Sequence, residues 1–193
     1  SVEALSNMMV GRPVQLEVEK DVARPGEPVF KVENLTVPSR VHNNNAVKDI
    51  SFEVRRGEIT CIAGIDGNGQ SELIYAITGI AKSSSGRLLL HDKDITKLSI
   101  RKRGNEGMSH IPEDRHKYGL VLDFSLEDNM VLQNYWQPQF QNHGFIKRDA
   151  IREYADGLIE KFDVRSSQGP MTVARTMSGG NQQKAIVARE MDK

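Results

Sequence analysis

The sequence has little cysteine, no surplus of charge and no long apolar run, and each shortage excludes a class of protein. The single cysteine, Cys61, cannot form an internal disulfide, which is consistent with a reduced, cytosolic setting. Its 26 Lys and Arg residues balance 26 Asp and Glu residues, so the overall charge points neither to nucleic acid nor to an anionic membrane surface. No apolar run approaches the roughly 20 residues that span a bilayer. The N-terminal ten residues lack the basic and apolar regions of a signal peptide.

Breaker residues and hydrophobic periodicity divide the first part of the chain. Residues 1–27 end in prolines and a glycine and are predicted to be a linker. Apolar residues alternate along 29–37 and 46–54, which predicts two strands of an antiparallel layer. The fully apolar run 59–63 predicts a buried strand of a parallel sheet, with Cys61 as a buried small side chain.

The second part of the chain reads as short strands followed by helices. We expect strands at 87–91 and 107–111 and a solvated basic helix face at 101–104. Ser125 followed by acidic residues predicts a helix start. Apolar residues at three- and four-residue spacing over 151–162 predict an amphipathic helix. The length of 193 residues suits one domain or a core with an inserted subdomain.

A glycine-rich turn follows the apolar run and opens into a helix. Gly64, Gly69 and Ser71 match the phosphate-loop pattern G-x-x-x-x-G-K-[ST], but Gln70 occupies the lysine position. Glycines allow several backbone N–H groups to point inward as an anion nest, and the helix adds its positive N-terminal end. Ser71 offers a hydroxyl to magnesium. The loop alone leaves open a working nucleotide site, a degenerate one or a purely structural turn.

A second set of small residues lies about a hundred residues further on, at the start of another helix. Residues 178–183 read Ser-Gly-Gly-Asn-Gln-Gln. A serine hydroxyl and free backbone N–H groups at a helix N-terminus can hold a phosphate. On its own, this segment is equally consistent with a capped helix.

Taken together, these segments resemble the ATP-binding domains of ABC transporters. Residues 177–184 resemble the family's signature motif in the form typical of sugar- and nucleoside-importer ATPases, and residues 64–71 resemble its Walker A loop. Residues 111–115, Ile-Pro-Glu-Asp-Arg, resemble the segment that replaces the Q-loop in the second half of tandem sugar-type ATPases. Met9–Arg12 resembles the linker between the two halves. Residues 67–73 look most like the second half of nucleoside importers.

The resemblance implies an α/β fold, with a P-loop (RecA-like) ATPase core, an antiparallel β layer and an inserted α-helical subdomain, incomplete at the C-terminus. It divides the chain into a linker at 1–27, core and β layer at 28–112, helical subdomain at 113–169, and signature motif with its helix at 170–193. The implied ligands are ATP and Mg²⁺, with Ser71 and Glu113 at the metal. The implied nucleotide-binding residues are Gly64, Asp66, Gly67, Asn68, Gly69, Gln70, Ser71, Glu72, Ser178, Gly179, Gly180 and Gln182.

Three features depart from the family pattern. Gln70 replaces the Walker A lysine, and no aromatic residue lies between Val37 and Ala46 to stack on adenine, so Val37 or His42 would have to substitute. The chain ends at Lys193 before any Walker B strand, catalytic glutamate or switch histidine, which suggests a fragment. We therefore assign no catalytic residue and expect the chain alone not to hydrolyse ATP. Magnesium-dependent turnover that is lost on changing Ser71 would contradict this.

The resemblance implies that the full-length protein couples ATP binding and hydrolysis to the import of a nucleoside or simple sugar. Its partners would be the N-terminal half of the same ATPase and transmembrane permease subunits, with no nucleic acid. The permease subunits would hold it peripherally at the cytoplasmic face of the plasma membrane. Tyr135 and Trp136 are candidates for the permease contact, with helical packing as the alternative. The alternatives for function are a non-transport ABC ATPase, a nucleotide-binding or scaffold module without catalysis, and a P-loop kinase.

Overall fold

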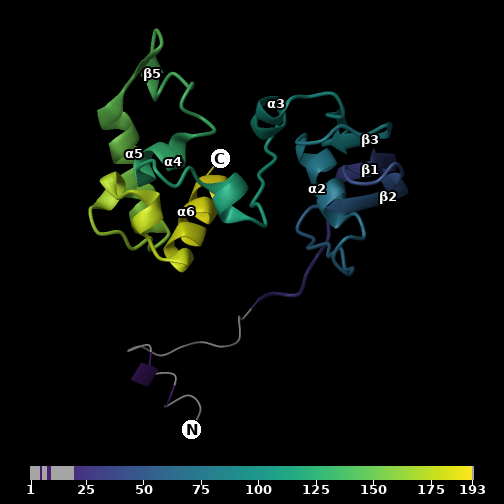
Figure 1. Cartoon of the computed structure of the whole chain (residues 1–193), viewed down its shortest axis with the longest axis horizontal. Coiled ribbons are helices and arrows are strands. Elements are labelled where there is room, and N and C mark those ends of the chain that lie inside the picture. The colour runs from purple at the N-terminus through teal and green to yellow at the C-terminus, as the bar shows by residue number, and fades with distance from the viewer. Residues whose placement is uncertain (1–4, 6–7, 10–19, 193) are drawn as a thin grey trace.

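The computed structural model describes residue 5, residues 8–9 and residues 20–192. Most of the linker predicted at 1–27, including all but Met9 of the Met9–Arg12 segment, lies outside the described residues. Figure 1 shows two lobes joined by a stretch of chain. One lobe holds the sheet with α2 and α3, and the other holds α4, α5 and α6.

The sheet has four strands in the order β2-β1-β3-β4, and every pairing is antiparallel. Its two long strands, β1 (Pro28–Pro38) and β2 (Asn45–Arg55), confirm the prediction from alternation. The other two are β3 (Ser85–Leu90) and β4 (Lys93–Asp94). The mixed α/β fold with an antiparallel layer is therefore as expected.

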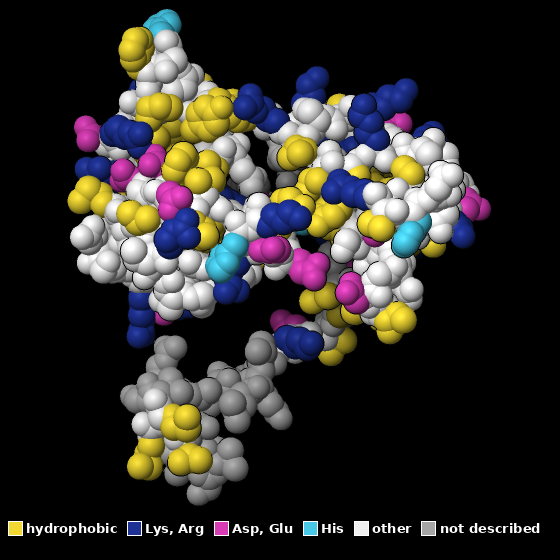
Figure 2. All heavy atoms as spheres, viewed as in Figure 1, with side chains coloured by type: hydrophobic (Ala, Val, Ile, Leu, Met, Phe, Trp, Pro, Cys, Tyr) yellow, Lys and Arg dark blue, Asp and Glu magenta, His cyan; other side chains and the backbone are white. Residues whose placement is uncertain are grey.

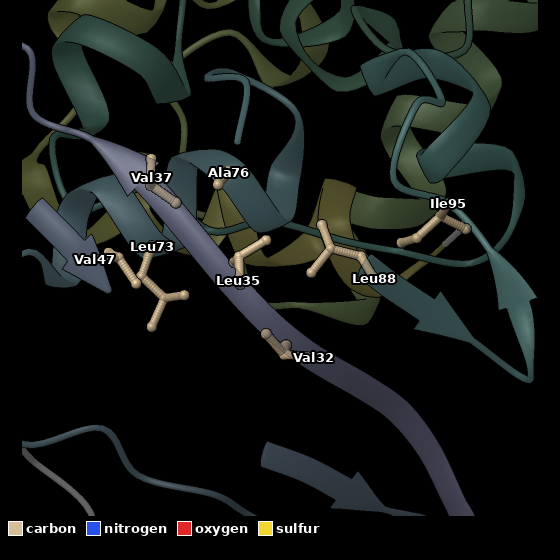
Figure 3. Close-up of a cluster of buried hydrophobic side chains, with 8 residues drawn as sticks. All are labelled: Val32, Leu35, Val37, Val47, Leu73, Ala76, Leu88 and Ile95. Carbon is tan, nitrogen blue, oxygen red and sulfur yellow. The ribbon is translucent and has the colours of Figure 1, made fainter. Parts of the chain in front are cut away.

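Helix α2 (Gln70–Thr78) packs on this sheet and closes the first hydrophobic core. Figure 3 shows side chains from β1, β2, β3 and α2 gathered in one cluster. The cluster consists of Val32, Leu35, Val37, Val47, Leu73, Ala76, Leu88 and Ile95. Since Leu73 and Ala76 point into it, the core fixes the direction in which the helix begins, and so fixes the glycine loop before it.

The predicted strands at 59–63 and 107–111 are wrong: both segments lack regular structure. Ile59 is 95% exposed, and Cys61, expected to be buried, is exposed as well. An apolar segment becomes a strand only when a neighbour supplies partners for its N–H and C=O groups. Among residues 20–192 no strand pairs with either segment, so the expected parallel sheet is not found there.

The basic run at 101–104 lies in α3 (Ile100–Asn105), and the expected solvated face holds only for Arg101 and Lys102. Arg103 is 4% exposed. Its guanidinium donates to the carbonyls of Ala76 at 2.7 Å and Thr96 at 2.7 Å, and to those of Ile77 and Leu98. Burial lowers its pKa, and the carbonyls at the negative end of α2 compensate the charge.

The other lobe is helical, as predicted. It begins with η1 (Arg115–Gly119), a single turn of π-helix, followed by α4 (Leu126–Val131). Ser125 caps α4 by accepting from the Asp128 backbone N–H at 3.2 Å, which confirms the predicted helix start. A small hairpin of β5 (Gln141–Asn142) and β6 (Phe145–Ile146) follows.

Four further elements complete this lobe, beginning with α5 (Arg148–Lys161), whose buried Ile151, Ala155 and Leu158 confirm the amphipathic helix. Two short 3₁₀ turns, η2 (Gly169–Met171) and η3 (Ala174–Thr176), lead to α6 (Gly179–Met191). Segment 170–193 was predicted as a separate unit, but α6 shares a hydrophobic core with α4 and α5. No helix among the described residues is both long and apolar enough to cross a bilayer.

Candidate functional site

The glycine loop is held against the sheet by its last glycine. Gly69 caps the start of α2 in the left-handed region, at φ 95°. A Cβ there would lie 2.5 Å from the carbonyl oxygen of Ala46 at the start of β2. Only glycine combines this backbone conformation with so close an approach. Asn68 N–H donates to the Ile65 carbonyl at 3.3 Å and closes the turn.

Gln70, which stands where the pattern has lysine, folds back over the loop. A Cβ at Gly64 would lie 1.8 Å from the Gln70 Nε2 atom, so the amide rests directly on Gly64. No described side chain caps the N-terminus of α2. Glu72 in its first turn places a negative charge near this positive end of the helix, where it is stabilising. The loop thus offers backbone N–H groups and one neutral amide donor, with no cation among its own residues.

The structure brings Ser71 and Glu113 to one cavity. A hollow of about 350 Å³ is lined by the start of α2, by residues 110–113 and by Tyr118 of η1. Among the described residues no group of three or more His, Cys, Asp and Glu side chains could hold a metal ion. A hydroxyl and one carboxylate nonetheless fit Mg²⁺, which keeps several waters and takes few protein ligands when a phosphate is present.

Most of the predicted loop residues face solvent. Asp66, Gly67, Asn68 and Ser71 are exposed, whereas Gly69 is buried. Of the two candidates for stacking on adenine, Val37 is wrong because it lies in the core and is 1% exposed. His42 is exposed in the turn between β1 and β2.

A second hollow of about 720 Å³ lies on the other side of the loop, between β2 and the apolar run before Gly64. Val47, Ile50 and Leu73 line it together with residues 60–63. Sequence reasoning did not predict this hollow, because it read 59–63 as covered on both faces.

The second motif forms the N-terminus of α6. Ser178 is the extended residue before the helix, and Gly179 and Gly180 begin it. The Ser178 hydroxyl does not cap the helix but accepts from Asn181 Nδ2 at 3.0 Å. Asn181 Oδ1 in turn accepts from the Arg165 backbone N–H at 2.9 Å. The first N–H groups of α6 are therefore left without a side-chain cap, as an anion site at a helix end requires.

Gln182 does not belong to this exposed end. It is 4% exposed, and its Nε2 donates to the Ala174 carbonyl at 2.9 Å. Its Oε1 accepts from Arg115 Nε at 3.3 Å and lies 3.0 Å from His116 Nε2. Gln182 was predicted to bind nucleotide, but its amide is committed to these protein groups. The sequence did not reveal that Arg115 and His116 contact Gln182, because these two residues precede it by 67 and 66 positions.

A third hollow, of about 930 Å³, separates α3 from residues 132–139 of the helical lobe. Figure 2 shows the molecule hollowed between its lobes, with hydrophobic and basic side chains on the rim. The Arg101 guanidinium lies 5.2 Å from the Trp136 ring centre, and both residues line the hollow. Asn134 Oδ1 is buried there and has no hydrogen-bond partner among the described residues. Burial, followed by the nearby Asp192 carboxylate, raises the pKa of Tyr154 to about 12.

The two motifs lie in different lobes, because α2 belongs to the sheet lobe and α6 to the helical lobe (Figure 1). Each offers a helix N-terminus and glycine backbone. The glycine loop contains no cation, and Lys184 of the second motif is paired with Asp163 at 2.7 Å. Two separate helix N-termini of this chain are thus of the kind that can accept an anion.

Comparison with known proteins covers both segments. The family described as "ABC transporter" matches residues 47–193. The chain is 44% identical over 191 residues to the nucleoside import ATP-binding protein NupA of Lactococcus lactis subsp. cremoris, covering 99% of this chain and 37% of that protein. It is 44% identical, with the same coverage, to the guanosine import ATP-binding protein NupO of Bacillus subtilis. It is 36% identical to the glucose import ATP-binding protein TsgD13 of Haloferax volcanii, over 98% of this chain and 34% of that one.

The chain thus spans little more than a third of the length of these curated relatives. Among solved structures, a nucleotide-free ATP-binding cassette from an ABC transporter matches with a TM-score of 0.65 and 21% identity, over 86% of this chain and 65% of that one. CbiO1 from Clostridium perfringens, part of the ABC transporter complex CbiONQ, matches with a TM-score of 0.62 and 22% identity, over 86% of this chain and 61% of that one. These structural matches establish the cassette fold.

Proposed function

Because this chain belongs to the ABC transporter family, we propose that it is the ATP-binding domain from the second half of a tandem importer ATPase. ABC ATPases bind ATP, and the relatives named for nucleoside and guanosine import are 44% identical to this chain. The proposed solute is therefore a nucleoside, with a simple sugar as the second choice, supported by the glucose-import relative at 36% identity. The N-terminal half and the permease subunits are the proposed partners.

The observation that carries the proposal is the loop at the start of α2. Gly69 fixes a left-handed cap against β2, and the uncapped helix end points its N–H groups at the loop. That geometry suits the phosphates of a nucleotide. Gln70 Nε2 would donate one hydrogen bond, and Ser71 with Glu113 would hold Mg²⁺. The ion, when bound, neutralises phosphate charge that this loop lacks a lysine to balance.

The start of α6 has a different proposed ligand. The lobes separate Ser178, Gly179 and Gly180 from this chain's own loop, so we assign them to a nucleotide held by the N-terminal half. The composite site then needs two halves facing head to tail. We retain 28–112 as the core with its β layer and 113–169 as the helical subdomain, and we group 170–193 with the latter because α6 packs there.

We expect the loop to bind ATP, and Gln70→Lys to raise its affinity about tenfold, or about 1.4 kcal/mol, because a full charge then faces the phosphates. Isothermal titration with ATP and Mg²⁺ measures the change. Gln139→Lys is the matched control, since it adds the same charge at an exposed position outside the loop. If neither the unsubstituted chain nor Gln70→Lys bound ATP at millimolar concentration, a scaffold module that holds no nucleotide would be favoured.

The hollow beside Trp136 is the proposed seat of a permease segment, which would hold the protein at the cytoplasmic face of the membrane. The hollow offers the Trp136 ring, on which the Arg101 guanidinium is stacked, and the Asn134 Oδ1 atom, which has no hydrogen-bond partner among the described residues. A helix that carries both apolar side chains and hydrogen-bond donors would match this surface. A non-transport ATPase or a P-loop kinase would have no need of such a surface.

Trp136→Ala should weaken binding of the full-length protein to its permease about 30-fold, as expected for a tryptophan hot spot worth about 2 kcal/mol. Binding is measured with permease in lipid nanodiscs. Phe145→Ala removes an 80% exposed ring from β6, which does not line the hollow, and serves as the control. Equal affinities for the two variants would count against this surface.

A further inference from the structure

The last turn of α6 carries two buried residues of opposite charge, Arg189 and Glu190. Arg189 Nε donates to Glu190 Oε1 at 3.1 Å, and the two side chains are 4% and 1% exposed. A buried ion pair is a weak stabilising device, because removing both charges from water costs about as much as their attraction returns. The other hydrogen bonds of the pair therefore show what it holds in place.

Glu190 holds the start of segment 109–119, which passes beside the end of α6 where the chain joins the two lobes (Figure 1). Its Oε2 accepts from the His110 backbone N–H at 3.2 Å, and its backbone carbonyl accepts from Ser109 Oγ at 2.7 Å. Gln133 Nε2 donates to Glu190 Oε1 at 2.6 Å and fixes the carboxylate further. Two successive residues of the segment are thus bonded to a single residue of α6.

Arg189 holds the other end of the same segment. Its Nη1 donates to the Gly119 carbonyl at 2.9 Å and to the Asn129 carbonyl at 3.2 Å. Segment 109–119 is therefore anchored at both ends by neighbouring residues of one helix turn. Fixing the two ends of a loop at a set separation removes much of the conformational freedom of the residues between them.

Glu113 lies inside the anchored segment and has no anchor of its own. The residue is exposed, and no hydrogen bond or ion pair with another described residue fixes its carboxylate. Residues 110–113 line the hollow of about 350 Å³ that also contains Ser71. Where the Glu113 carboxylate can reach in this hollow is therefore set by the backbone, and the backbone is set by the anchors.

We propose that the Arg189–Glu190 pair orients Glu113 toward Ser71, with Glu190 as the positioning residue. The inference rests on the proposed Mg²⁺ site and deepens it by naming what places one of its two protein ligands. Groups that orient a metal ligand typically cost about 10- to 100-fold in metal affinity when they are changed. Because Glu190 acts through the backbone at Ser109 and His110, the lower end of that range applies.

ATP titration of this chain, once with Mg²⁺ and once with EDTA, measures the gain in ATP affinity that Mg²⁺ provides. We expect Glu190→Gln to reduce this gain about tenfold and to change the affinity in EDTA much less. The glutamine keeps one oxygen acceptor, which cannot serve Arg189, Gln133 and His110 together. Since Glu190 acts through Glu113, Glu190→Gln should have no further effect on the gain when Glu113→Gln is already present.

Glu127→Gln is the matched control. Glu127 is also buried, at 5% exposed, and pairs with Arg152 Nε at 3.0 Å in the same lobe, but it makes no hydrogen bond to segment 109–119. This variant loses a buried ion pair as well and should keep the full gain from Mg²⁺. If circular dichroism shows that Glu190→Gln does not fold, Ser109→Ala removes only the hydroxyl that bonds the Glu190 carbonyl, and should reduce the gain about threefold.

The outcomes separate this inference from the proposed function. An unchanged gain in Glu190→Gln, or in Ser109→Ala where that variant replaces it, would overturn the inference alone. An equal loss in Glu127→Gln, or a loss that adds to that of Glu113→Gln, would do the same, because both indicate a general loss of stability. A full gain from Mg²⁺ in Glu113→Gln would contradict the proposed metal site, and absence of ATP binding in the unsubstituted chain would contradict the proposed function itself.

Discussion

Arg103→Met is expected to lower the free energy of unfolding by about 3–5 kcal/mol, since each buried carbonyl left without a donor costs about 1–3 kcal/mol. The Arg103 side chain serves the carbonyls of Ala76, Ile77, Thr96 and Leu98, and it is 4% exposed. Methionine fills a similar volume but donates nothing. Because two of the four carbonyls belong to the last turns of α2, the loss also removes the cation from the negative end of that helix.

Urea unfolding followed by circular dichroism measures the loss of stability, and an unchanged m-value supports a two-state comparison. Lys102→Met on the exposed face of α3 is the control, and should change stability by less than about 0.5 kcal/mol. If Arg103→Met were as stable as this control, the donors that remain, such as Gly79 N–H at 3.3 Å from the Ala76 carbonyl oxygen, would suffice for these carbonyls.

Gly69→Ala is expected to reduce ATP affinity about 10- to 100-fold, the equivalent of one or more charge-assisted hydrogen bonds at about 1.5–3 kcal/mol. Two penalties act together at this position. The backbone has φ 95°, which alanine adopts only with strain, and the new Cβ would approach the Ala46 carbonyl oxygen to 2.5 Å. The loop must move away from β2 to relieve this contact, so its N–H groups no longer converge.

Gly144→Ala is the control that introduces the backbone strain of a left-handed alanine without displacing the glycine loop. Gly144 has φ 88° in the turn between β5 and β6, and a Cβ there would meet nothing within 4 Å. This control carries the same conformational penalty of about 1 kcal/mol far from the loop, and should leave ATP affinity unchanged. ATP titration of both variants, with stability measured alongside, shows which loss is specific. Equal affinity in Gly69→Ala and the unsubstituted chain would mean that the loop is not the nucleotide site.

Features of the site that depend on local backbone chemistry were predictable from the sequence. Gly69 and Ser71 could be recognised because a phosphate loop needs glycine where the backbone is left-handed and a hydroxyl where the helix starts. Ser178 with its two glycines was recognisable for a similar reason, as a helix start with free N–H groups. Both segments lie within residues 47–193, the part of the chain that matches the ABC transporter family.

Features that depend on distant partners were not predictable. The run 59–63 reads as a buried strand, but the described residues provide no strand beside it, and Ile59 is exposed. Arg103 reads as a surface cation in a basic run, yet it is buried and its guanidinium donates to backbone carbonyls of α2 and of the segment before α3. Gln182 reads as a motif residue that contacts nucleotide, and instead it joins α6 to η1.

The sequence by itself therefore determined the glycine turn before α2, the start of α6, the antiparallel strands and the amphipathic helix, because each follows from the conformational preferences and periodicity of neighbouring residues. Only the tertiary structure decided which face of each helix is used, that Ser71 and Glu113 share a hollow, and that Arg115 and His116 meet at Gln182. These contacts join residues tens of positions apart, and the free energy that selects them comes from burying and pairing groups whose partners no local pattern reveals.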